Sequence, residues 1–573
     1  MERKDLLNKL WEFQNTYGYI SKNAIYEIAK KLKISTIEIE GVITFYHFFH
    51  SKPTGKFIIY LNNSIICEFK GFQQIKAAFE KETGCTFGEY DKNPLFSLFE
   101  TSCIGLSDQE PAALINFHPV TNLTPQKVKK IIQQLKNGAS LKSIESTFTS
   151  KIRYTPPEDK TVIFREYKVG KSLKNIKSAD KILDLITKSK LTGRGGAFFS
   201  TAKKWKYCKD SNSSKKIVVC NADEGEPGTF KDKSLLNNLP GLLLEGMIIA
   251  AHVTGAKTGF IYLRAEYKYL LRNLESTLKD FYTKGLLGTN ILGIKNFDFS
   301  IEIQLGAGSY VCGEEKALIE SLEGKRGVPR IQKYFPTENG YLGYSTIVNN
   351  VETFVKAART LELGLKFISK IGTNNSKGTK LLSISGDVAK PGIYEIEWGI
   401  TVREILKLCE ALSPYYVQIS GPSGQCINNT EFDRKICDED LICGGSIMVF
   451  NKSRSILHIQ ENFMKFFKME SCGVCTPCRA GNQILYEKII KLKRGLGTQQ
   501  DLDEIKEWGK IIQLSSRCGL GKTSPNSLVM AIDKFKDYFN LKISPSHDNK
   551  NVEFDMEAAI YDYDSLIKET QNQ

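Results

Sequence analysis

The stretch Glu470-Ser-Cys472-Gly-Val-Cys475-Thr-Pro-Cys478-Arg-Ala-Gly481 says more about the fold than any other part of the sequence. It places three cysteines at C-x2-C-x2-C spacing, with a glycine and a proline that allow a tight turn before a helix. This spacing, with thiolates as the only ligands, is typical of a [4Fe–4S] cluster. A fourth ligand is required, and Cys518, in a glycine-flanked loop, is the only cysteine after Cys478. The sequence therefore predicts that a cluster is bound by Cys472, Cys475, Cys478 and Cys518.

A structural zinc site with four cysteine ligands is the alternative. Such sites usually place their cysteines in two separate pairs, whereas here three lie together and one lies apart, which favours iron–sulfur. Six of the cysteines outside this cluster are expected to be small buried hydrophobic residues. These are Cys85, Cys208, Cys409, Cys426, Cys437 and Cys443.

Composition and charge indicate a globular protein. The 573 residues predict several domains, at roughly 100–200 residues per domain. With 41% hydrophobic and 25% charged residues, collagen-like, disordered and membrane classes are excluded. The net charge of +15 makes nucleic-acid binding a candidate function. Lys alternates with Asp and Glu, however, so a solvated Lys-rich surface is favoured and no nucleic-acid partner is expected. Part of the excess positive charge lies between Lys127 and Lys216, where it is available to an anionic ligand.

The sequence predicts neither a signal peptide nor a membrane span. The N-terminus contains acidic residues and no uninterrupted apolar core. The longest apolar stretch, GLLLEGMIIAAHV, is interrupted by Glu245 and His252 and is shorter than the ~20 residues that a span requires. We therefore expect a cytoplasmic protein, and fourteen cysteines in a reducing compartment argue against a disulfide framework.

Periodicity predicts a multidomain α/β protein. Between the N-terminal and central units, a polar segment with two consecutive prolines is expected to be a linker. The expected units are a helical and small α/β domain (1–140), the linker (141–160), a Rossmann-like α/β domain (161–378), a β-grasp-like domain (379–456), a helical domain with the cysteines (457–545) and a C-terminal tail (546–573).

Three loops of the central domain are candidates for one nucleotide pocket. The first, 191–199, has consecutive glycines whose N–H groups suit a phosphate, with positive charge from Arg194 and Lys204. The second, 217–228, is a strand that opens into an acidic loop. Its carboxylates are expected to hydrogen-bond ribityl or ribose hydroxyls. They belong to Asp223, Glu224 and Glu226.

The third loop, 306–315, resembles a G-x-G-x-x-G fingerprint. Val311 stands at the last glycine position, so it is not a proper dinucleotide-binding match. Each loop alone is a weak signal, because a glycine-rich turn is often purely structural. Together, and upstream of the cysteines, the three loops predict a nucleotide cofactor next to an iron–sulfur centre.

The segments GRGGAFF, CNADEGEPGTFKD, GAGSYVCGEEKALIESLEG, NNVET and ESCGVCTPCRAG, between about Lys181 and Leu541, closely resemble the NADH-oxidising flavoprotein subunit of respiratory complex I and its soluble relatives. The resemblance implies that FMN and NADH bind one fold and that electrons pass to a [4Fe–4S] cluster. The FMN contacts it implies are Gly193, Arg194, Gly195, Lys204, Asn221, Asp223, Gly313, Glu314, Asn349 and Asn350. The NADH contacts it implies are Phe199, Glu226, Tyr310, Glu315 and Phe335.

In this resemblance, Glu226 and Glu315 orient the nicotinamide and ribose, while hydride moves directly between cofactors. Two positions depart from the family. Phe198 stands where the family usually has glycine, and Lys206 where some members have an aromatic residue near NADH. We therefore expect altered cofactor affinity.

The N-terminal domain resembles the thioredoxin-like [2Fe–2S] subunit that partners this flavoprotein. The four ligand positions are occupied by Asn62, Cys67, Cys103 and Ser107. Because such clusters normally take four thiolates, a [2Fe–2S] cluster at Cys67 and Cys103 is not expected. The domain is interpreted as a docking and structural unit, and all flavin and NADH motifs follow Lys181. Removal of this domain is therefore expected to spare NADH oxidation by dyes.

Within the family, the fused N-terminal domain points to the diaphorase alpha subunits of soluble NAD-reducing [NiFe] hydrogenases. The resemblance implies as partners a small iron–sulfur diaphorase subunit and a [NiFe] hydrogenase dimer. Alternatives are the same module in complex I, a formate dehydrogenase or an electron-bifurcating complex, and, from another class, a zinc-stabilised nucleic-acid-binding scaffold. His47 and His50, in an aromatic run, are interpreted as a packed helix face rather than a metal site.

Overall fold

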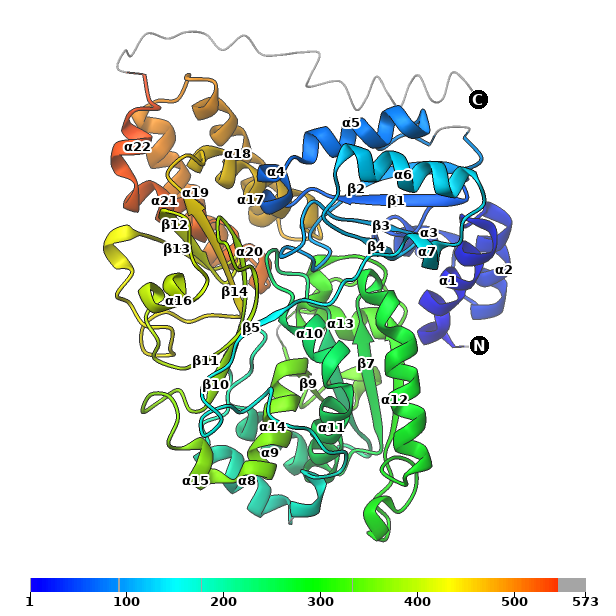
Figure 1. Ribbon diagram of the computed structural model, residues 1–573. Helices are drawn as coiled ribbons and strands as arrows, with labels where there is room; N and C mark the ends of the chain where they lie inside the picture. Colours follow the sequence, from blue (N-terminus) through cyan, green and yellow to red (C-terminus); the bar gives the residue numbers. More distant parts are fainter. Residues whose placement is uncertain (1, 91–92, 177, 332, 545–573) are drawn as a thin grey trace.

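A computed structural model describes residues 2–90, 93–176, 178–331 and 333–544 (Figure 1). It is a mixed α/β protein with three sheets and a helical C-terminal part. The expected C-terminal tail, 546–573, lies outside the described residues. In Figure 1 the N-terminal domain and the C-terminal helices lie side by side above the central α/β domain.

The N-terminal domain has the thioredoxin-like sheet order β2-β1-β3-β4, in which β1 is parallel to β2 and antiparallel to β3. Its strands are β1 (Phe57–Asn62), β2 (Phe96–Thr101), β3 (Ala113–Ile115) and β4 (His118–Val120). Its helices are α1 (Leu6–Tyr17), α2 (Lys22–Leu32), α3 (Thr36–Ile43), α4 (Ile65–Phe69), α5 (Phe72–Thr83) and α6 (Pro125–Lys136).

The two faces of this sheet bury different partners, as the alternation of side chains along a strand requires. Ile59 and Leu61 of β1 pack in one core with α5 and α6. Tyr60, between them, belongs to a second core that includes α1–α3 and residues of the central domain. The N-terminal domain is therefore joined to the central domain through a shared hydrophobic core.

The central domain is a four-stranded parallel sheet with order β8-β7-β6-β9. Its strands are β6 (Lys216–Ala222), β7 (Thr258–Leu263), β8 (Ser300–Leu305) and β9 (Ser345–Asn350). Its helices are α8 (Ala179–Lys188), α9 (Thr201–Asp210), α10 (Lys231–Asn238), α11 (Pro240–Thr254), α12 (Leu271–Thr283), α13 (Glu315–Leu322), α14 (Val351–Leu363) and α15 (Leu365–Ile368).

This strand order creates a switch point between β6 and β9. The chain moves outward from β6 to β7 and β8, then returns to place β9 on the other side of β6. In such sheets, ligands bind in the crevice at the carboxyl ends of the strands where the order reverses. On the sheet, Val218 and Cys220 face the core of α8–α12 and α14, while Ile217 and Val219 face α13 and the N-terminal helices.

The third sheet has the order β13-β12-β14-β10-β11-β5. It has the β-grasp topology: the antiparallel hairpin β10–β11 is followed by a helix and two further strands, and then by β14, which lies parallel to β10. Its elements are β10 (Thr379–Gly386), β11 (Gly392–Glu397), α16 (Val402–Leu408), β12 (Pro414–Ile419), β13 (Gln425–Asn428) and β14 (Ser446–Asn451).

The segment expected to be a linker, 141–160, is partly ordered into this sheet. It contains α7 (Leu141–Ile144) and β5 (Ile152–Tyr154), and β5 pairs in parallel with β11. The short polar segment does not predict a strand by itself. It forms one because the edge of β11 offers backbone groups that would otherwise be unpaired.

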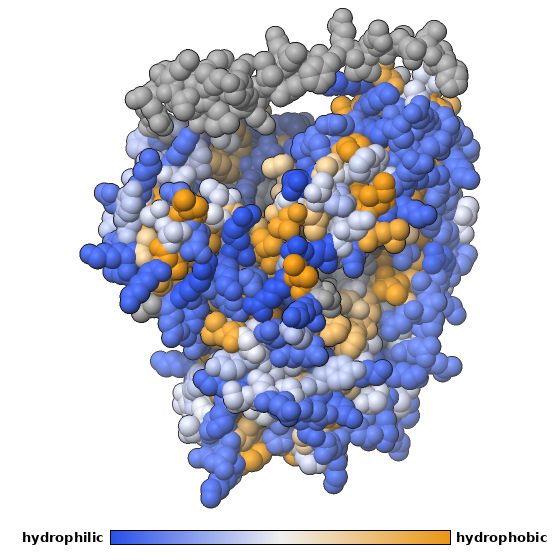
Figure 2. Space-filling model, turned by 180° about the vertical axis from the view of Figure 1, so that it is seen from behind, coloured by the Kyte–Doolittle hydropathy of each residue, from blue (hydrophilic) through white to orange (hydrophobic). Residues whose placement is uncertain are grey.

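The C-terminal part is helical, as expected. Its helices are α17 (Ile456–Glu470), α18 (Thr476–Lys493), α19 (Gln499–Ser515), α20 (Gly519–Thr523), α21 (Asn526–Lys534) and α22 (Lys536–Asn540). Within the described residues, no single helix has the length and apolar character to cross a membrane. Only α10 and α11 together, bent by 96°, pass that test, and both are mainly buried. Figure 2 shows that hydrophilic residues cover most of one face, with hydrophobic residues in separate patches.

Candidate functional site

The crevice at the switch point is framed by three asparagines at strand ends. Asn221, near the end of β6, donates from Nδ2 to the carbonyl of Gly313 at 2.8 Å. Asn349 accepts from the indole N–H of Trp205 at 2.9 Å. Asn350 caps α14, accepting from the N–H of Glu352 at 3.0 Å. The structure therefore gathers these predicted residues at one edge of the sheet, beside the N-terminus of a helix.

The glycine loop lies against the same edge. A Cβ on Gly195 would lie 3.3 Å from the Cβ of Asn350, so the loop approaches β9 closely enough that a side chain there would require Asn350 to shift by a few tenths of an ångström. Gly196 has a φ of 111° and Phe198 a φ of 50°, both in the left-handed region. The positive φ of Phe198 explains why a glycine suits that position. We call the space between this loop and the N-terminus of α14 the cradle; a glycine loop beside a helix N-terminus is a place that favours an anion.

Arg194 does not bring its charge directly to this cradle. Its backbone N–H donates to Thr353 Oγ1 at 2.9 Å. Its guanidinium is buried at 1% exposure and lies over the ring of Trp398, 4.7 Å from the centroid. The side chain thus joins the central domain to the β-grasp domain. Lys204, by contrast, pairs with Glu315 at 2.9 Å and donates to the carbonyl of Val348 at 3.1 Å.

Glu224 is also turned away from the crevice. Its carboxylate accepts from the backbone N–H groups of Asp232 and Lys233 and from the hydroxyl of Tyr267, at 2.8–3.1 Å. It therefore caps the start of α10, which is where a carboxylate stabilises a helix. Burial raises the pKa of Glu224 to about 7. The sequence showed an acidic loop but not which carboxylates the loop turns inward.

Glu226 and Tyr310 are brought together, as expected of two residues serving one ligand. The hydroxyl of Tyr310 donates to Glu226 Oε2, and the other carboxylate oxygen accepts from the N–H of Ser423 at 2.9 Å. Burial raises the pKa of Glu226 to about 7. Ser423 belongs to the β12–β13 connection, so the β-grasp domain contributes to this side of the site.

The remaining predicted residues lie around α13 and on the surface. Glu314 caps α13, accepting from the N–H groups of Lys316 and Ala317 at 3.0 and 2.9 Å. Phe199 is 46% exposed and Phe335 is 60% exposed. Exposed aromatic rings of this kind are available to stack on a planar ligand.

The four predicted cysteine ligands line one enclosed cavity, together with Val311 and Leu520. Within the described ranges, no group of three or more His, Cys, Asp or Glu side chains is arranged to hold a single metal ion. Four thiols around a shared, largely apolar space are a donor set that fits an iron–sulfur cluster. All other cysteines are free and buried, which confirms that they are core residues.

Two groups important to the site were not predicted. Glu470 accepts from the backbone N–H of Tyr310 at 2.9 Å and from the hydroxyl of Ser102 at 3.0 Å. It stood in the quoted cysteine motif, but no local pattern assigned it a partner. Glu352 is fully buried and accepts hydrogen bonds from Lys380 Nζ and the N–H of Leu381.

Glu352 joins α14 to the β-grasp sheet within a cluster of buried charges. Burial alone would raise its pKa, but Lys380 and Lys231 hold the pKa of Glu352 below its ordinary value. Burial also lowers the pKa of Lys380 to about 8. The negative charge of Glu352 and the positive charges of Lys380 and Lys231 therefore offset one another. These buried charges lie next to the cradle.

The vacated ligand positions in the N-terminal domain form a hydrogen-bonded group. Asn62 donates to Glu110 Oε1 and to Ser64 Oγ, and Cys103 Sγ lies 3.6 Å from Ser107 Oγ. An amide and a hydroxyl replace two of four thiolates, so this donor set does not fit a [2Fe–2S] cluster.

The two histidines are packed, but not on a helix. His47 lies in a turn after α3 and His50 in the irregular segment that follows, and His50 contacts the hydroxyls of Tyr60 and Tyr90 at 2.6 and 2.9 Å. Burial lowers the pKa of His50 to about 3. Their interpretation as packed side chains stands, and the expected helix face is wrong because α3 ends at Ile43.

Comparison with known proteins gives matches over almost the whole chain. Three family models match: a thioredoxin-like [2Fe-2S] ferredoxin at residues 1–136, the Nuo51 FMN-binding domain at 186–359, and the NADH-ubiquinone oxidoreductase-F iron-sulfur binding region at 458–542. The NAD-reducing hydrogenase HoxS subunit alpha of Cupriavidus necator is 44% identical, covering 100% of this chain and 97% of its own length.

Other matches cover less sequence or are structural. One subunit of the NADH-quinone oxidoreductase of Aquifex aeolicus is 38% identical over 63% of this chain and 85% of its own length. A chain in the crystal structure of an NAD+-reducing [NiFe]-hydrogenase in the H2-reduced state superposes with a TM-score of 0.90 and 33% identity. That match covers 99% of this chain and 97% of the other.

Proposed function

The chain belongs to the family of NAD-reducing hydrogenase alpha subunits, and from this premise we propose that it exchanges hydride with NAD(H) through bound FMN. Electrons would pass through a [4Fe–4S] cluster in the C-terminal helices. When bound, FMN supplies the chemistry that accepts a hydride and releases single electrons. The contribution of this chain is to bind, orient and connect the two cofactors.

The residues of the crevice fit these roles. The glycine loop around Gly195 and the N-terminus of α14 would hold the FMN phosphate, while Asn221 and Asn349 would hold the ribityl chain and ring. Lys204 and Glu315 form an ion pair at the mouth, with side chains 19% and 30% exposed. Phe199 and Phe335 would stack on NADH, and Glu226 would orient its nicotinamide end. We assign no FMN contact to the side chains of Arg194 and Glu224.

One observation carries the proposal. Tyr310, hydrogen-bonded to Glu226 at the crevice, is followed directly by Val311, which lines the cavity shared by the four cysteines. The proposed NADH and flavin crevice and the proposed cluster site would therefore meet across a single short loop. Such proximity is what electron transfer between the two cofactors requires.

The full-length match favours a hydrogenase complex over the alternatives. The relative named as a hydrogenase alpha subunit matches the N-terminal domain as well, whereas the NADH-quinone oxidoreductase relative covers only 63% of this chain. We propose as partners a small iron–sulfur subunit and a [NiFe] hydrogenase dimer, and a cytoplasmic location. The same module in complex I, a formate dehydrogenase or a bifurcating complex is the competing assignment.

The purified complex tests this function. The chain should show flavin absorption with broad iron–sulfur bands, and it should reduce dyes with NADH. Together with its copurifying subunits it should reduce NAD+ with H2. A colourless chain would contradict the cofactor assignment. A coloured chain whose partners lack hydrogenase activity would support the module but contradict the hydrogenase assignment.

A further inference from the structure

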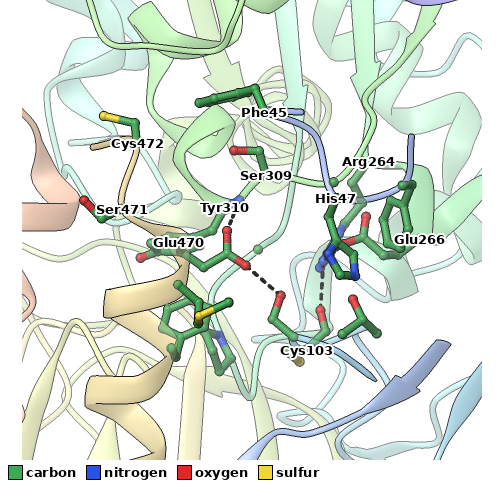
Figure 3. Close-up of a pocket in the computed structure, with 18 of the residues that line it drawn as sticks. Phe45, His47, Cys103, Arg264, Glu266, Ser309, Tyr310, Glu470, Ser471 and Cys472 are labelled. Atoms are coloured by element: carbon green, nitrogen blue, oxygen red, sulfur yellow. Dashed lines mark hydrogen bonds and ion pairs between the residues drawn. The ribbon is translucent and has the colours of Figure 1, made fainter. Parts of the chain in front are cut away.

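A cavity of about 590 Å3, with charged and apolar side chains in its walls, lies where the N-terminal domain, the central domain and α17 meet (Figure 3). Its walls include Glu100 and Cys103 of the N-terminal domain, Asp223 and Glu266 of the central domain, and Glu470 of α17. Asp223 and Tyr310 also belong to the proposed flavin and NADH site. The cavity therefore reaches the loops of that site from the side of the N-terminal domain.

Several buried polar atoms on its walls have no hydrogen-bond partner. Glu266 is 5% exposed; it bonds Arg264 through Oε1, and its Oε2 is unpartnered. Arg264 is 3% exposed, and its Nε is unpartnered, as is Asp223 Oδ2. Buried polar groups in native proteins nearly always have partners, and ordered water beside a cavity is a common one.

We propose that this cavity is a water-filled proton path between the flavin crevice and solvent, with Asp223 as the carboxyl at its inner end and Glu266 as the next carboxyl along it. This inference rests on the proposed function. Oxidation of one NADH to NAD+ yields two electrons and one proton. The electrons leave through the cluster, and the proton must reach water; NAD+ reduction needs the reverse movement.

The charge environment of Asp223 supports a proton-exchanging role. Burial raises the pKa of Asp223 to about 8; Glu266 and Glu470 add to the rise, and Arg264 opposes it. The other titratable groups coupled to Asp223 are Tyr46 of the N-terminal domain, Tyr262 of β7 and Cys312. A carboxyl with this pKa gains and loses a proton near neutral pH, as efficient proton exchange requires.

The main test is Glu266→Gln in the holoenzyme, because Glu266 is outside the proposed flavin contacts and Gln can still accept from Arg264. Glu100→Gln is the matched control. Glu100 lines the same cavity, but its carboxylate is bonded to Lys76 at 2.7 Å and to Asn63 at 3.2 Å. Proton release is followed with a pH indicator in stopped flow with NADH and an electron acceptor, and acceptor reduction is followed in parallel.

In the unmodified protein and in Glu100→Gln, proton release should keep pace with electron transfer. In Glu266→Gln it should lag by about ten-fold or more, and added imidazole, a small proton carrier, should restore it. A merely structural role would not respond to imidazole. Release that keeps pace in Glu266→Gln would overturn the path, while an unmodified protein without flavin or NADH oxidation would instead overturn the proposed function.

A second measurement needs no folded variant of Glu266. Isotope-edited infrared spectra of the full chain labelled with 13C-aspartate separate aspartate carboxyls from glutamates. In the chain without flavin, one protonated aspartate band should disappear with a midpoint near pH 8 and should be missing in Asp223→Asn. Absence of such a band from the unmodified chain would also overturn the assignment of Asp223.

Discussion

The carboxylate of Glu470 accepts a hydrogen bond of 2.9 Å from the backbone N–H of Tyr310. This bond ties the last residue of α17, two positions before Cys472, to the loop that reaches both the flavin crevice and the cluster cavity. The other oxygen accepts from Ser102 of the N-terminal domain. One partly buried carboxylate thereby connects three parts of the chain.

Glu470→Ala should therefore slow electron transfer from flavin to cluster more than it slows flavin reduction by NADH. It leaves the N–H of Tyr310 without its partner, which costs about 1–3 kcal/mol of stability. Ser102→Ala, which removes only the second bond, is the control and should have the smaller effect. The two steps are separated by stopped-flow absorbance. Equal slowing of both steps would contradict a connecting role for Glu470.

Cys475→Ser should lower the iron content while leaving flavin in place, because one of four thiolates around the shared cavity is lost. The unmodified chain should hold about four iron atoms, since only the C-terminal site has a complete thiolate set. Iron per chain and the EPR signal of the reduced protein measure both. About six iron atoms per unmodified chain would show that the N-terminal domain does hold a cluster.

Gly195→Val should weaken FMN binding by at least about ten-fold, or ~1.4 kcal/mol. Its Cβ would lie 3.3 Å from Asn350, and the added methyl groups would enter the cradle. Gly444→Ala is a matched control beside the same loop, because its Cβ would meet Gly196 at an ordinary 3.8 Å. Flavin released on denaturation gives the readout. Stoichiometric FMN in a folded Gly195→Val protein would show that the phosphate binds elsewhere.

Glu110→Gln should remove part of the pH dependence of stability. Burial raises the pKa of Glu110 to about 8, although its hydrogen bond with Asn62 opposes the rise. From about pH 4.5 to about pH 8 the folded state keeps a proton that the unfolded chain has lost, so stability falls as pH rises. The variant should lie close to the unmodified chain near pH 5 and exceed it by an amount of the order of 4 kcal/mol above pH 8.

Urea unfolding of the full chain at both pH values measures this difference. Lys76→Gln removes the ion-pair partner of Glu100 in the same domain. Its stability relative to the unmodified chain should not change between the two pH values. A difference between Glu110→Gln and the unmodified chain that is constant with pH would mean that Glu110 is ionised in the folded protein.

The gathering of the four cysteines around one cavity was predictable from sequence, because three of them lie within seven residues, where spacing alone sets the geometry. Side-chain direction was not predictable in the same way. Arg194 and Glu224 stand in the expected loops, but packing against Trp398 and the start of α10 turns both away from the crevice. The strand at Ile152–Tyr154 was missed because its partner is far along the chain.

The core shared by the N-terminal and central domains was also not predictable. Motif positions indicated that residues 1–140 are dispensable for NADH oxidation by dyes. The structure argues otherwise, because Tyr60 and the helices α1–α3 cover the face of the central sheet to which Ile217 and Val219 belong. Removing the domain would expose this apolar face to water.

The pairing of β5 with β11 has a consequence for biosynthesis. Ile152 leaves the ribosome about 240 residues before Ile393, its partner across the sheet. At roughly 5–20 residues per second, the nascent strand waits about 10–50 s before it can pair. During that time its backbone N–H and C=O groups form an open edge, the kind of surface on which chains associate wrongly. Translation speed and chaperones acting on this interval, rather than the stability of the finished fold, would then limit how much of the protein is recovered.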